Sequence, residues 1–226
     1  NPDLLCSHNY ITHFFAVRKS IVDKINGFRS EFDGSQDYDF VLRATEQAHH
    51  VHHIPQMLYH WRTLASSVAG DPRSKMYAYE AGRKAIEAAL ERRGIAGDVR
   101  MLDNLGTYKI DYADYTPTVA VVASSLADAQ VKQLREMTDY PSFTVIAAAA
   151  DSVNDVAKRR SEDVIVLLNG MKPTDGTWLR EMVNYARPSS VGVVGGKVFD
   201  AKKRVLNVGV TLRALKQGEP FEMRGS

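Results

Sequence analysis

The feature that most constrains the fold is an alternation of apolar runs and amphipathic helical runs in the second half of the chain. The runs "TVAVVAS", "FTVIAAAA" and "DVIVLLN" are almost continuously apolar, and segments such as "DAQVKQLREM" and "GTWLREMVNYA" lie between or after them. Strands that are apolar on both faces are typical of a parallel sheet covered by helices. The sequence therefore predicts an α/β fold, with further strands in "SVGVVGGKVFD" and "VLNVGVTL".

The first half predicts shorter elements. Residues 8–18 are expected to form a strand, and "SIVDKINGF" a short helix with Ser20 as its cap and Gly27 at its end. Ser35 is a good candidate to cap the next helix, over residues 36–47, because a serine oxygen can accept a hydrogen bond from a free backbone N–H.

A longer helix is predicted over residues 74–93, where "SKMYAYEAGRKAIEAALERR" is rich in strong helix formers. Gly94 is expected to end it, and Gly82 in its interior weakens the prediction. The string "DNLGTYKIDYADYTP" that follows is interpreted as a linker, which places a domain boundary near residue 116.

The composition excludes several classes of function. The formal net charge is +2 and the basic residues are scattered, which argues against a nucleic-acid partner and a polybasic membrane anchor. The single cysteine, Cys6, fits a reducing compartment and excludes a Cys-based zinc site. The longest apolar runs are too short to cross a bilayer, so no transmembrane segment is expected. We expect a cytoplasmic protein, with peripheral attachment to the inner face of the membrane as an alternative.

Four histidines are crowded together and raise the question of a metal site. They are His49, His50, His52 and His53. Two of them share one face of a predicted strand, but no third protein ligand is implied nearby. An exposed strand is the favoured interpretation.

Longer motifs in the second half point to a known family. The strings "TDYPSFTVIAAAADS", "GTWLREMVNYARPSSVGVVGGKVFD" and "LNVGVTL" resemble the nucleotide-sugar-binding half of family 2 glycosyltransferases, which have the GT-A fold. The resemblance covers nearly all of residues 116–212. It implies a Rossmann-like mixed sheet flanked by helices and a nucleotide-sugar donor as substrate. It also implies a nucleotide site at Ser124, Asp151, Asn169 and Lys172.

The metal ligands of that family are missing from this sequence. The resemblance implies a divalent metal, Mg²⁺ or Mn²⁺, held by paired acids because a leaving nucleoside diphosphate needs a Lewis acid. Here the stretch reads "NGMK" from Asn169 to Lys172, without a carboxylate, and Asp151 is displaced from the family's nucleoside-contacting acid. Lys172 is either a fixed cation in place of the metal or a solvated turn residue on a degenerate site.

The first half is similar to the acceptor-binding half of the same family. The string "FFAVRKSIVDKINGFRSEFDGSQDYDFVLRATEQAHHVHHIPQMLYHWR", within residues 8–68, carries the resemblance. It implies that Asp37 is the catalytic base of an inverting transfer, and that Asp39, His60 and Arg62 bind substrate. A base must be ionised to take the proton of an acceptor hydroxyl, and the first turn of a helix favours a negative charge.

Two alternatives remain for these residues. Asp37 and Asp39 could merely complement the dipole of their helix, which is a common role of acids at helix starts. His60 and Arg62, which alternate onto one face, could equally be polar residues at a strand end.

The two halves stand in the reverse of the family's order. The chain also begins "NPDLLC" without an initiator Met, so we expect a piece of a longer protein with two tandem modules. In that interpretation residues 1–70 are an acceptor-binding half, residues 71–115 a helical connection and linker, and residues 116–226 a nucleotide-sugar-binding-like half. Alternatively, the halves complement each other as a permuted domain, within one chain or exchanged between two copies of a homodimer.

The resemblance implies transfer of a sugar from a nucleotide-sugar donor to a glycan acceptor in polysaccharide biosynthesis. This chain alone is expected to be an incomplete and inactive fragment of that enzyme. The alternative is a non-catalytic pseudo-glycosyltransferase module that binds glycan or scaffolds a partner.

Overall fold

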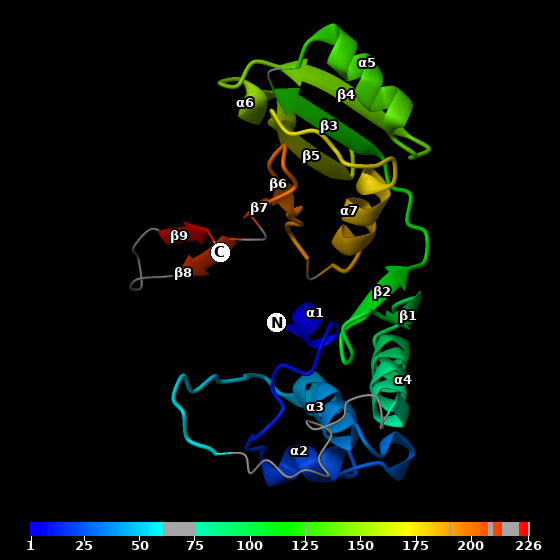
Figure 1. Cartoon of the computed structure of the whole chain (residues 1–226), viewed down its shortest axis with the longest axis vertical. Helices are drawn as coiled ribbons and strands as arrows, with labels where there is room; N and C mark the ends of the chain where they lie inside the picture. Colours follow the sequence, from blue (N-terminus) through cyan, green and yellow to red (C-terminus); the bar gives the residue numbers. More distant parts are fainter. Residues whose placement is uncertain (61–75, 125, 190, 208–209, 214–221, 226) are drawn as a thin grey trace. The chain divides into compact units, whose positions relative to one another are not determined.

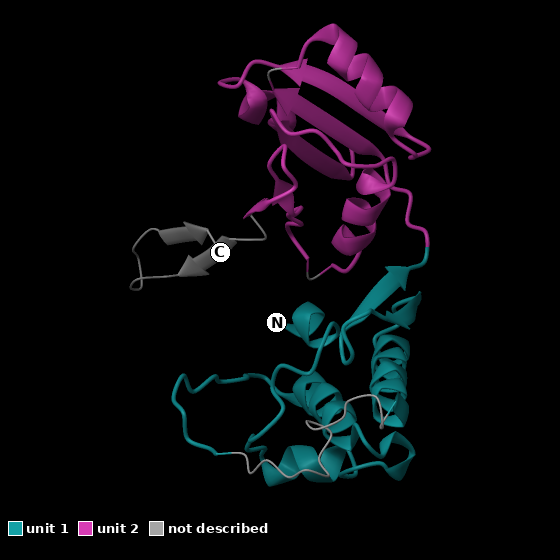
Figure 2. Ribbon diagram, viewed as in Figure 1, with its two compact units in different colours: residues 1–113 teal, residues 114–226 magenta. Residues whose placement is uncertain are grey.

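The chain forms two compact units, residues 1–113 and residues 114–226 (Figure 2). The computed structural model describes residues 1–60, 76–124, 126–189, 191–207, 210–213 and 222–225. Each unit has its own hydrophobic core of buried side chains. Within the ranges just given, no helix is both long enough and apolar enough to cross a membrane.

Unit 1 is mainly helical (Figure 1). Its helices are α1 (Pro2–Leu5), α2 (Lys19–Lys24), the 3-10 helix η1 (Ser30–Phe32), α3 (Gln36–Gln47) and α4 (Met76–Arg92). Helices α3 and α4 pack against each other, and α4 turns a row of buried small residues inward: Ala78, Ala81, Gly82, Ala85 and Ala89. Small side chains let two helices approach closely, so the alanine-rich sequence of α4 forms core rather than surface.

Two helices of unit 1 end in the same motif. At the end of α4, Gly94 has φ +65° and Ile95 N–H donates to Leu90 O at 2.9 Å. At the end of α2, Asn26 has φ 57° and Gly27 N–H donates to Val22 O at 3.1 Å. Both are Schellman motifs, which satisfy carbonyls left free at a helix end. The predicted end of the long helix at Gly94 is confirmed. Helix α2 ends at Lys24, and Asn26, one residue before the predicted Gly27, is the first left-handed residue after it.

Neither of the two serines predicted to cap a helix makes a capping hydrogen bond. Helix α2 begins at Lys19 with Arg18 in the cap position, so Ser20 lies inside the helix. Ser35 does occupy the cap position of α3, but its side chain makes no capping bond. Its Oγ donates instead to Ala78 O at 2.7 Å, and this bond joins the start of α3 to α4.

Residues 8–18 form an irregular segment and not the expected strand. A strand needs a neighbour for its backbone hydrogen bonds. Here local bonds take that place: Tyr10 N–H donates to His8 O, and Thr12 N–H donates to the Asn9 side chain at 3.1 Å. A short polar side chain has thus captured a backbone N–H that a strand ladder would have used.

A hairpin replaces part of the predicted linker. Strands β1 (Gly97–Met101) and β2 (Tyr108–Tyr112) pair antiparallel, with Val99 opposite Ile110. Val99, Tyr108 and Ile110 are buried in the core of unit 1. The alternation in "YKIDY" gives β2 one apolar face, which explains why this segment folds onto the unit. The assignment of residues 1–70, 71–115 and 116–226 to three functional parts stays a prediction.

Unit 2 confirms the predicted parallel sheet covered by helices. Its elements are β3 (Val119–Ser124), α5 (Asp128–Met137), β4 (Phe143–Ala148), α6 (Val153–Lys158), β5 (Val164–Asn169), α7 (Trp178–Ala186), β6 (Val198–Phe199), β7 (Val205–Asn207), β8 (Val210–Arg213) and β9 (Glu222–Gly225). The strands of the main sheet run parallel in the order β4-β3-β5. The pairs β6–β7 and β8–β9 are antiparallel. Of the strand expected in "SVGVVGGKVFD", the described residues 191–200 form only the two-residue strand Val198–Phe199.

The two faces of this sheet are covered differently. On one face Val121, Val145 and Val166 pack into the core with residues of α5 and α7, such as Leu134 and Leu179. The opposite face lies under the six-residue helix α6, which contacts β3 (Figure 1). Because α6 is short, part of that face stays uncovered, and this is where the candidate site lies.

Candidate functional site

The topology of unit 2 creates a crevice at the carboxyl edge of its sheet. The connection through α5 places β4 on one side of β3, and the connection through α6 places β5 on the other side. In open α/β sheets such a change of direction is where ligands bind, outside the carboxyl ends of the strands. A pocket of about 240 Å³ lies at this point, lined by Val122, Ser124, Ala150, Val153, Asn154, Leu167, Leu168 and Asn169.

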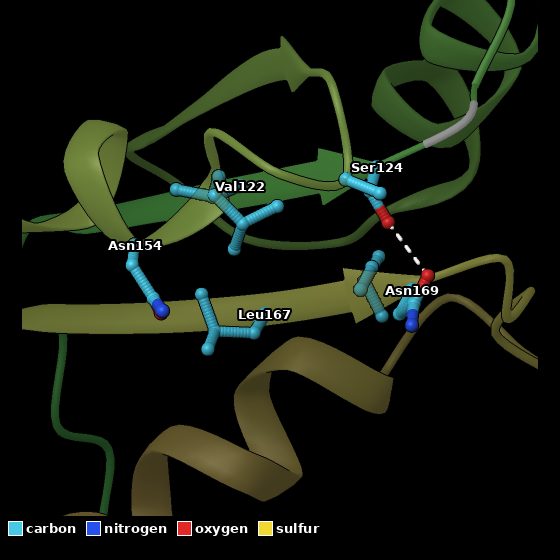
Figure 3. Close-up of a pocket in the computed structure, with 8 residues that line it drawn as sticks. Val122, Ser124, Asn154, Leu167 and Asn169 are labelled. Atoms are coloured by element: carbon cyan, nitrogen blue, oxygen red, sulfur yellow. Dashed lines mark hydrogen bonds between the residues drawn. The ribbon is translucent and has the colours of Figure 1, made fainter.

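A hydrogen bond joins two strand ends beside this pocket (Figure 3). Ser124 ends β3, Asn169 ends β5, and the two are register partners in the sheet. Ser124 Oγ donates to Asn169 Oδ1 at 2.7 Å, and Ser124 is only 1% exposed. Two residues back along each strand, Val122 and Leu167 form an apolar wall, and Leu167 is 52% exposed. The site combines apolar walls with a few polar groups, as ligand pockets generally do.

The residues predicted to bind a nucleotide are only partly brought together. Ser124 and Asn169 meet in the pocket, but Asp151 and Lys172 are not among the described residues that line it. Lys172 lines a second hollow of about 140 Å³ with residues of α5, namely Gln130, Gln133, Leu134 and Met137, and with Leu126, Met171 and Pro173. The nucleotide-binding roles of all four residues stay predictions.

Sequence reasoning missed the contribution of α6. Val153 and Asn154 line the pocket from this helix, and Ala150 lines it from the turn before the helix. A signal was present, because a short helical run that follows the second strand of a parallel sheet must cross back over a face of that sheet.

The donor atoms at this edge do not fit a divalent metal. Mg²⁺ and Mn²⁺ prefer carboxylate oxygens, and the polar groups of the pocket are a hydroxyl and amides. Asp175, farther along the chain, accepts bonds from Thr174 and Thr177, and these bonds lower the pKa of its carboxyl. In the part of the chain that the structure describes, which includes the four crowded histidines, no three acidic, histidine or cysteine side chains are grouped to hold a metal.

Asp37, the predicted base, lies in the first turn of α3 and is partly buried. The Nδ2 of Asn9 donates to its Oδ2 at 3.3 Å. The Oδ1 of Asn9 accepts the N–H of Thr12, so this one amide links the irregular segment to the helix. Asn9 was placed in a strand by its sequence pattern and its contact with Asp37 was missed, because nothing in the sequence relates positions 28 residues apart.

Asp39 is fully buried in an ion cluster and not exposed towards a substrate. Its carboxylate accepts bonds from Arg29 and from Arg43, the latter at 2.7 and 2.9 Å. Burial alone would raise the pKa of Asp39, but the bonds and charges of the two arginines outweigh it and hold the pKa below its usual range. Arg43 also donates to Ile25 O and Gly27 O. This geometry supports a structural role for Asp39, and its role in substrate binding stays a prediction.

His60 and Arg62, the other predicted substrate-binding residues, fall at the border of the described structure. His60 is exposed in an irregular segment, and Arg62 lies outside the described residues. Next to His60, the ring of Tyr59 lies 5.7 Å from that of Phe14, centroid to centroid. This contact joins the segment before His60 to Phe14, which belongs to the same irregular segment as Asn9. The roles of His60 and Arg62 remain predictions.

The fold and the site define an α/β protein with a pocket at the carboxyl edge of a parallel sheet. The chain is 28% identical to the O-antigen biosynthesis protein RfbC of Myxococcus xanthus, over 98% of this chain and 20% of that protein. It is 29% identical to the uncharacterized protein y4gI of Sinorhizobium fredii (strain NBRC 101917 / NGR234), over 94% of this chain and 28% of that protein. The chain therefore spans less than a third of the length of either relative. No family model matches it, and no solved structure matches it.

Proposed function

We propose that this chain is part of a polysaccharide-biosynthesis enzyme that transfers a sugar from a nucleotide-sugar donor to a glycan acceptor, on a GT-A-like fold. The observation that carries the proposal is the similarity to RfbC across 98% of the chain. The parallel sheet with a pocket at its switch point supports the donor side, since this is where such sheets bind nucleotide ligands.

Asp37 is the proposed catalytic base. One carboxylate oxygen is engaged by Asn9, which leaves the other available to the acceptor hydroxyl. The carboxylate takes the proton of this hydroxyl while the hydroxyl oxygen attacks the anomeric carbon. The nucleoside diphosphate leaves from the opposite side, so the configuration of that carbon is inverted.

The complete reaction belongs to the longer protein in this proposal. Asp37 is in unit 1 and the switch-point pocket is in unit 2, which would be parts of two successive modules. The short share of each relative that the chain spans supports this arrangement. The chain alone is therefore proposed to be inactive in transfer.

A second candidate is a non-catalytic module that binds glycan or scaffolds a partner. The observation that favours it is the lack of a carboxylate among the described lining residues of the unit 2 pocket. A transferase of this class that works with a metal would need acidic ligands there.

The test is transfer of a radiolabelled sugar to glycan by the longer protein with Asp37→Asn. Loss of a general base lowers turnover by about 10² to 10⁴-fold, and we expect a loss in that range. Asp33→Asn is the matched control, because Asp33 is an exposed acid four residues away and should leave turnover unchanged. Full turnover in Asp37→Asn would remove the proposed base, and no turnover in the unaltered protein would favour the non-catalytic candidate.

A further inference from the structure

Among the described residues, the polar side chains that line the pocket between β3 and β5 are uncharged. They are the hydroxyl of Ser124 and the side-chain amides of Asn154 and Asn169. The remaining lining side chains are aliphatic, with Val122 and Leu167 on neighbouring strands. A ligand of this pocket therefore meets a carbon surface and neutral hydrogen-bonding groups.

Charged side chains close in sequence do not line the pocket. Asp151 follows the lining residue Ala150 but is itself exposed. Lys158 is at the far end of α6 from Asn154, and Lys172 lines the other hollow. A diphosphate is normally bound by cationic side chains or through a metal. The described residues around this pocket supply neither.

The volume of the pocket also limits its ligand. The volume of about 240 Å³ is below the range of about 300 to 1,000 Å³ that is usual for sites of drug-sized ligands. The pocket would therefore hold one part of a nucleotide-sugar, such as a single ring, with the rest of the ligand outside it.

We propose that this pocket binds an uncharged, hydroxyl-bearing ring, the ribose of a nucleoside or the pyranose of a glycan, without a divalent metal. The class of ligand in this proposal rests on the proposed function. The residues that line the pocket all belong to unit 2. The proposal departs from the metal-bound diphosphate that the family resemblance implies.

The lining residues suit such a ring. The amides of Asn154 and Asn169 each offer both a donor and an acceptor, which is what a hydroxyl group needs. The Oδ1 of Asn169 already accepts the Ser124 hydroxyl, so its Nδ2 is the group that would donate to a ligand. Leu167, which is half exposed, would pack against the carbon face of the ring, with the buried Val122 behind it on the neighbouring strand.

The test titrates the 226-residue chain by two-dimensional NMR with four probes: uridine, methyl α-D-glucopyranoside, UDP with Mn²⁺, and UDP with EDTA. The first two probes separate the two sources of the ring. We expect uridine or the glucoside to bind, and UDP to bind with the same Kd, within about threefold, in Mn²⁺ and in EDTA. The proposal is overturned if Mn²⁺ strengthens UDP binding about tenfold or more, or if neither neutral probe binds at 10 mM, ~10 mM being a generous limit for a specific site.

A pair of variants locates the binding. Leu167→Trp fills the pocket from a position that is already half exposed, and should weaken binding of the neutral probe by about tenfold or more. Leu206→Trp is the control, because Leu206 is 64% exposed in β7 and does not line the pocket. Unchanged binding in Leu167→Trp, with its NMR spectrum still that of a folded protein, would overturn the assignment.

The failure of this inference is distinguishable from a failure of the proposed function. If the longer protein transfers no sugar while this chain binds the neutral probe without metal, only the proposed reaction fails. If UDP binding here requires Mn²⁺, the inference about the pocket fails and the proposed reaction stands.

Discussion

The side-chain amide of Asn9 holds one oxygen of Asp37, with 3.3 Å between Asn9 Nδ2 and Asp37 Oδ2. The same amide accepts the backbone N–H of Thr12, so its own orientation is fixed. We therefore propose Asn9 as a positioning residue for the proposed base, since it engages Oδ2 of the carboxylate and leaves Oδ1 for the acceptor hydroxyl.

Asn9→Ala should lower kcat of the longer protein by about tenfold, because a less well oriented base raises the activation free energy by about 1.4 kcal/mol. KM should change little, because Asn9 is not proposed to contact the donor substrate. Transfer assays on single and double variants check this. If Asn9 acts through Asp37, Asn9→Ala should have no further effect in the Asp37→Asn background. Thr12→Ala is the control, because it keeps the backbone N–H that Asn9 binds and should behave like the unaltered protein. The positioning role would be contradicted if Asn9→Ala caused an equal loss with Asp37 present and with Asp37→Asn.

Asp39→Asn should destabilise unit 1 by about 3 to 5 kcal/mol, because it leaves Arg29 and Arg43 without their buried partner. Amide hydrogen exchange of α3 measures this loss, with the amides of β3 in unit 2 as an internal reference. The contradicting result is unchanged protection of α3 relative to β3.

The same cluster predicts a dependence on acid. The pKa of Asp39 in the folded chain is below its ordinary value of 3.8, so the stability it adds is present above that value and is lost as the pH falls through the folded pKa. Protection of α3 should therefore fall below about pH 4 in the unaltered chain, and this fall should be smaller in Asp39→Asn. Equal acid sensitivity in the two proteins would assign the fall to other carboxyl groups.

Gly82→Ala should destabilise unit 1 by about 1 to 3 kcal/mol, although alanine is the better helix former. The added Cβ would overlap the hydroxyl of Tyr108, which donates to Tyr79 O at 2.8 Å. Tyr108→Phe removes that hydroxyl, so the double variant should recover part of the stability lost in Gly82→Ala. Chemical unfolding followed by circular dichroism measures the cycle, and strictly additive losses would refute the overlap.

Gly176→Ala should destabilise unit 2 by a similar amount, about 1 to 3 kcal/mol. Its Cβ would lie 2.7 Å from the backbone oxygen of Met137, and backbone cannot move aside as a side chain can. Gly192→Ala is the control, since nothing lies within 4 Å of the position of its Cβ. Thermal unfolding followed by Trp178 fluorescence, in a Trp61→Phe background, measures both, and equal melting temperatures would contradict the prediction.

The sheet of unit 2 was predictable because its strands are nearly continuous apolar runs, of which the central one, β3, is buried on both faces. The run "VAVVAS" in β3 is apolar on both faces of the strand, so neither face is suited to contact with water, and all of β3 is buried. The segment 8–18 was not predictable in the same way. Its apolar and polar residues alternate as in a strand, but Asn9 and its local bonds decide the conformation, and a sequence pattern contains no partner strand.

The candidate site was predictable at strand ends and not elsewhere. Ser124 and Asn169 end neighbouring parallel strands, so their meeting follows from the topology. The burial of Asp39 was hidden, because Arg29 reaches it from ten residues away and the charge alone suggested an exposed acid. Asn154 depends on the rotation of a six-residue helix, which periodicity fixes poorly in so short a run.

The bond between Ser124 and Asn169 makes the carboxyl edge of the sheet rigid before any ligand arrives. It joins two strand ends that are already paired in the sheet, so the pocket is preorganised and a ligand orders little of the chain. A ligand that displaced the bond would give up about 0.5 to 1.5 kcal/mol, or roughly two- to tenfold in affinity. In the proposed enzyme this edge would thus serve as a static binding surface, and any conformational signal between the proposed modules would have to arise outside it.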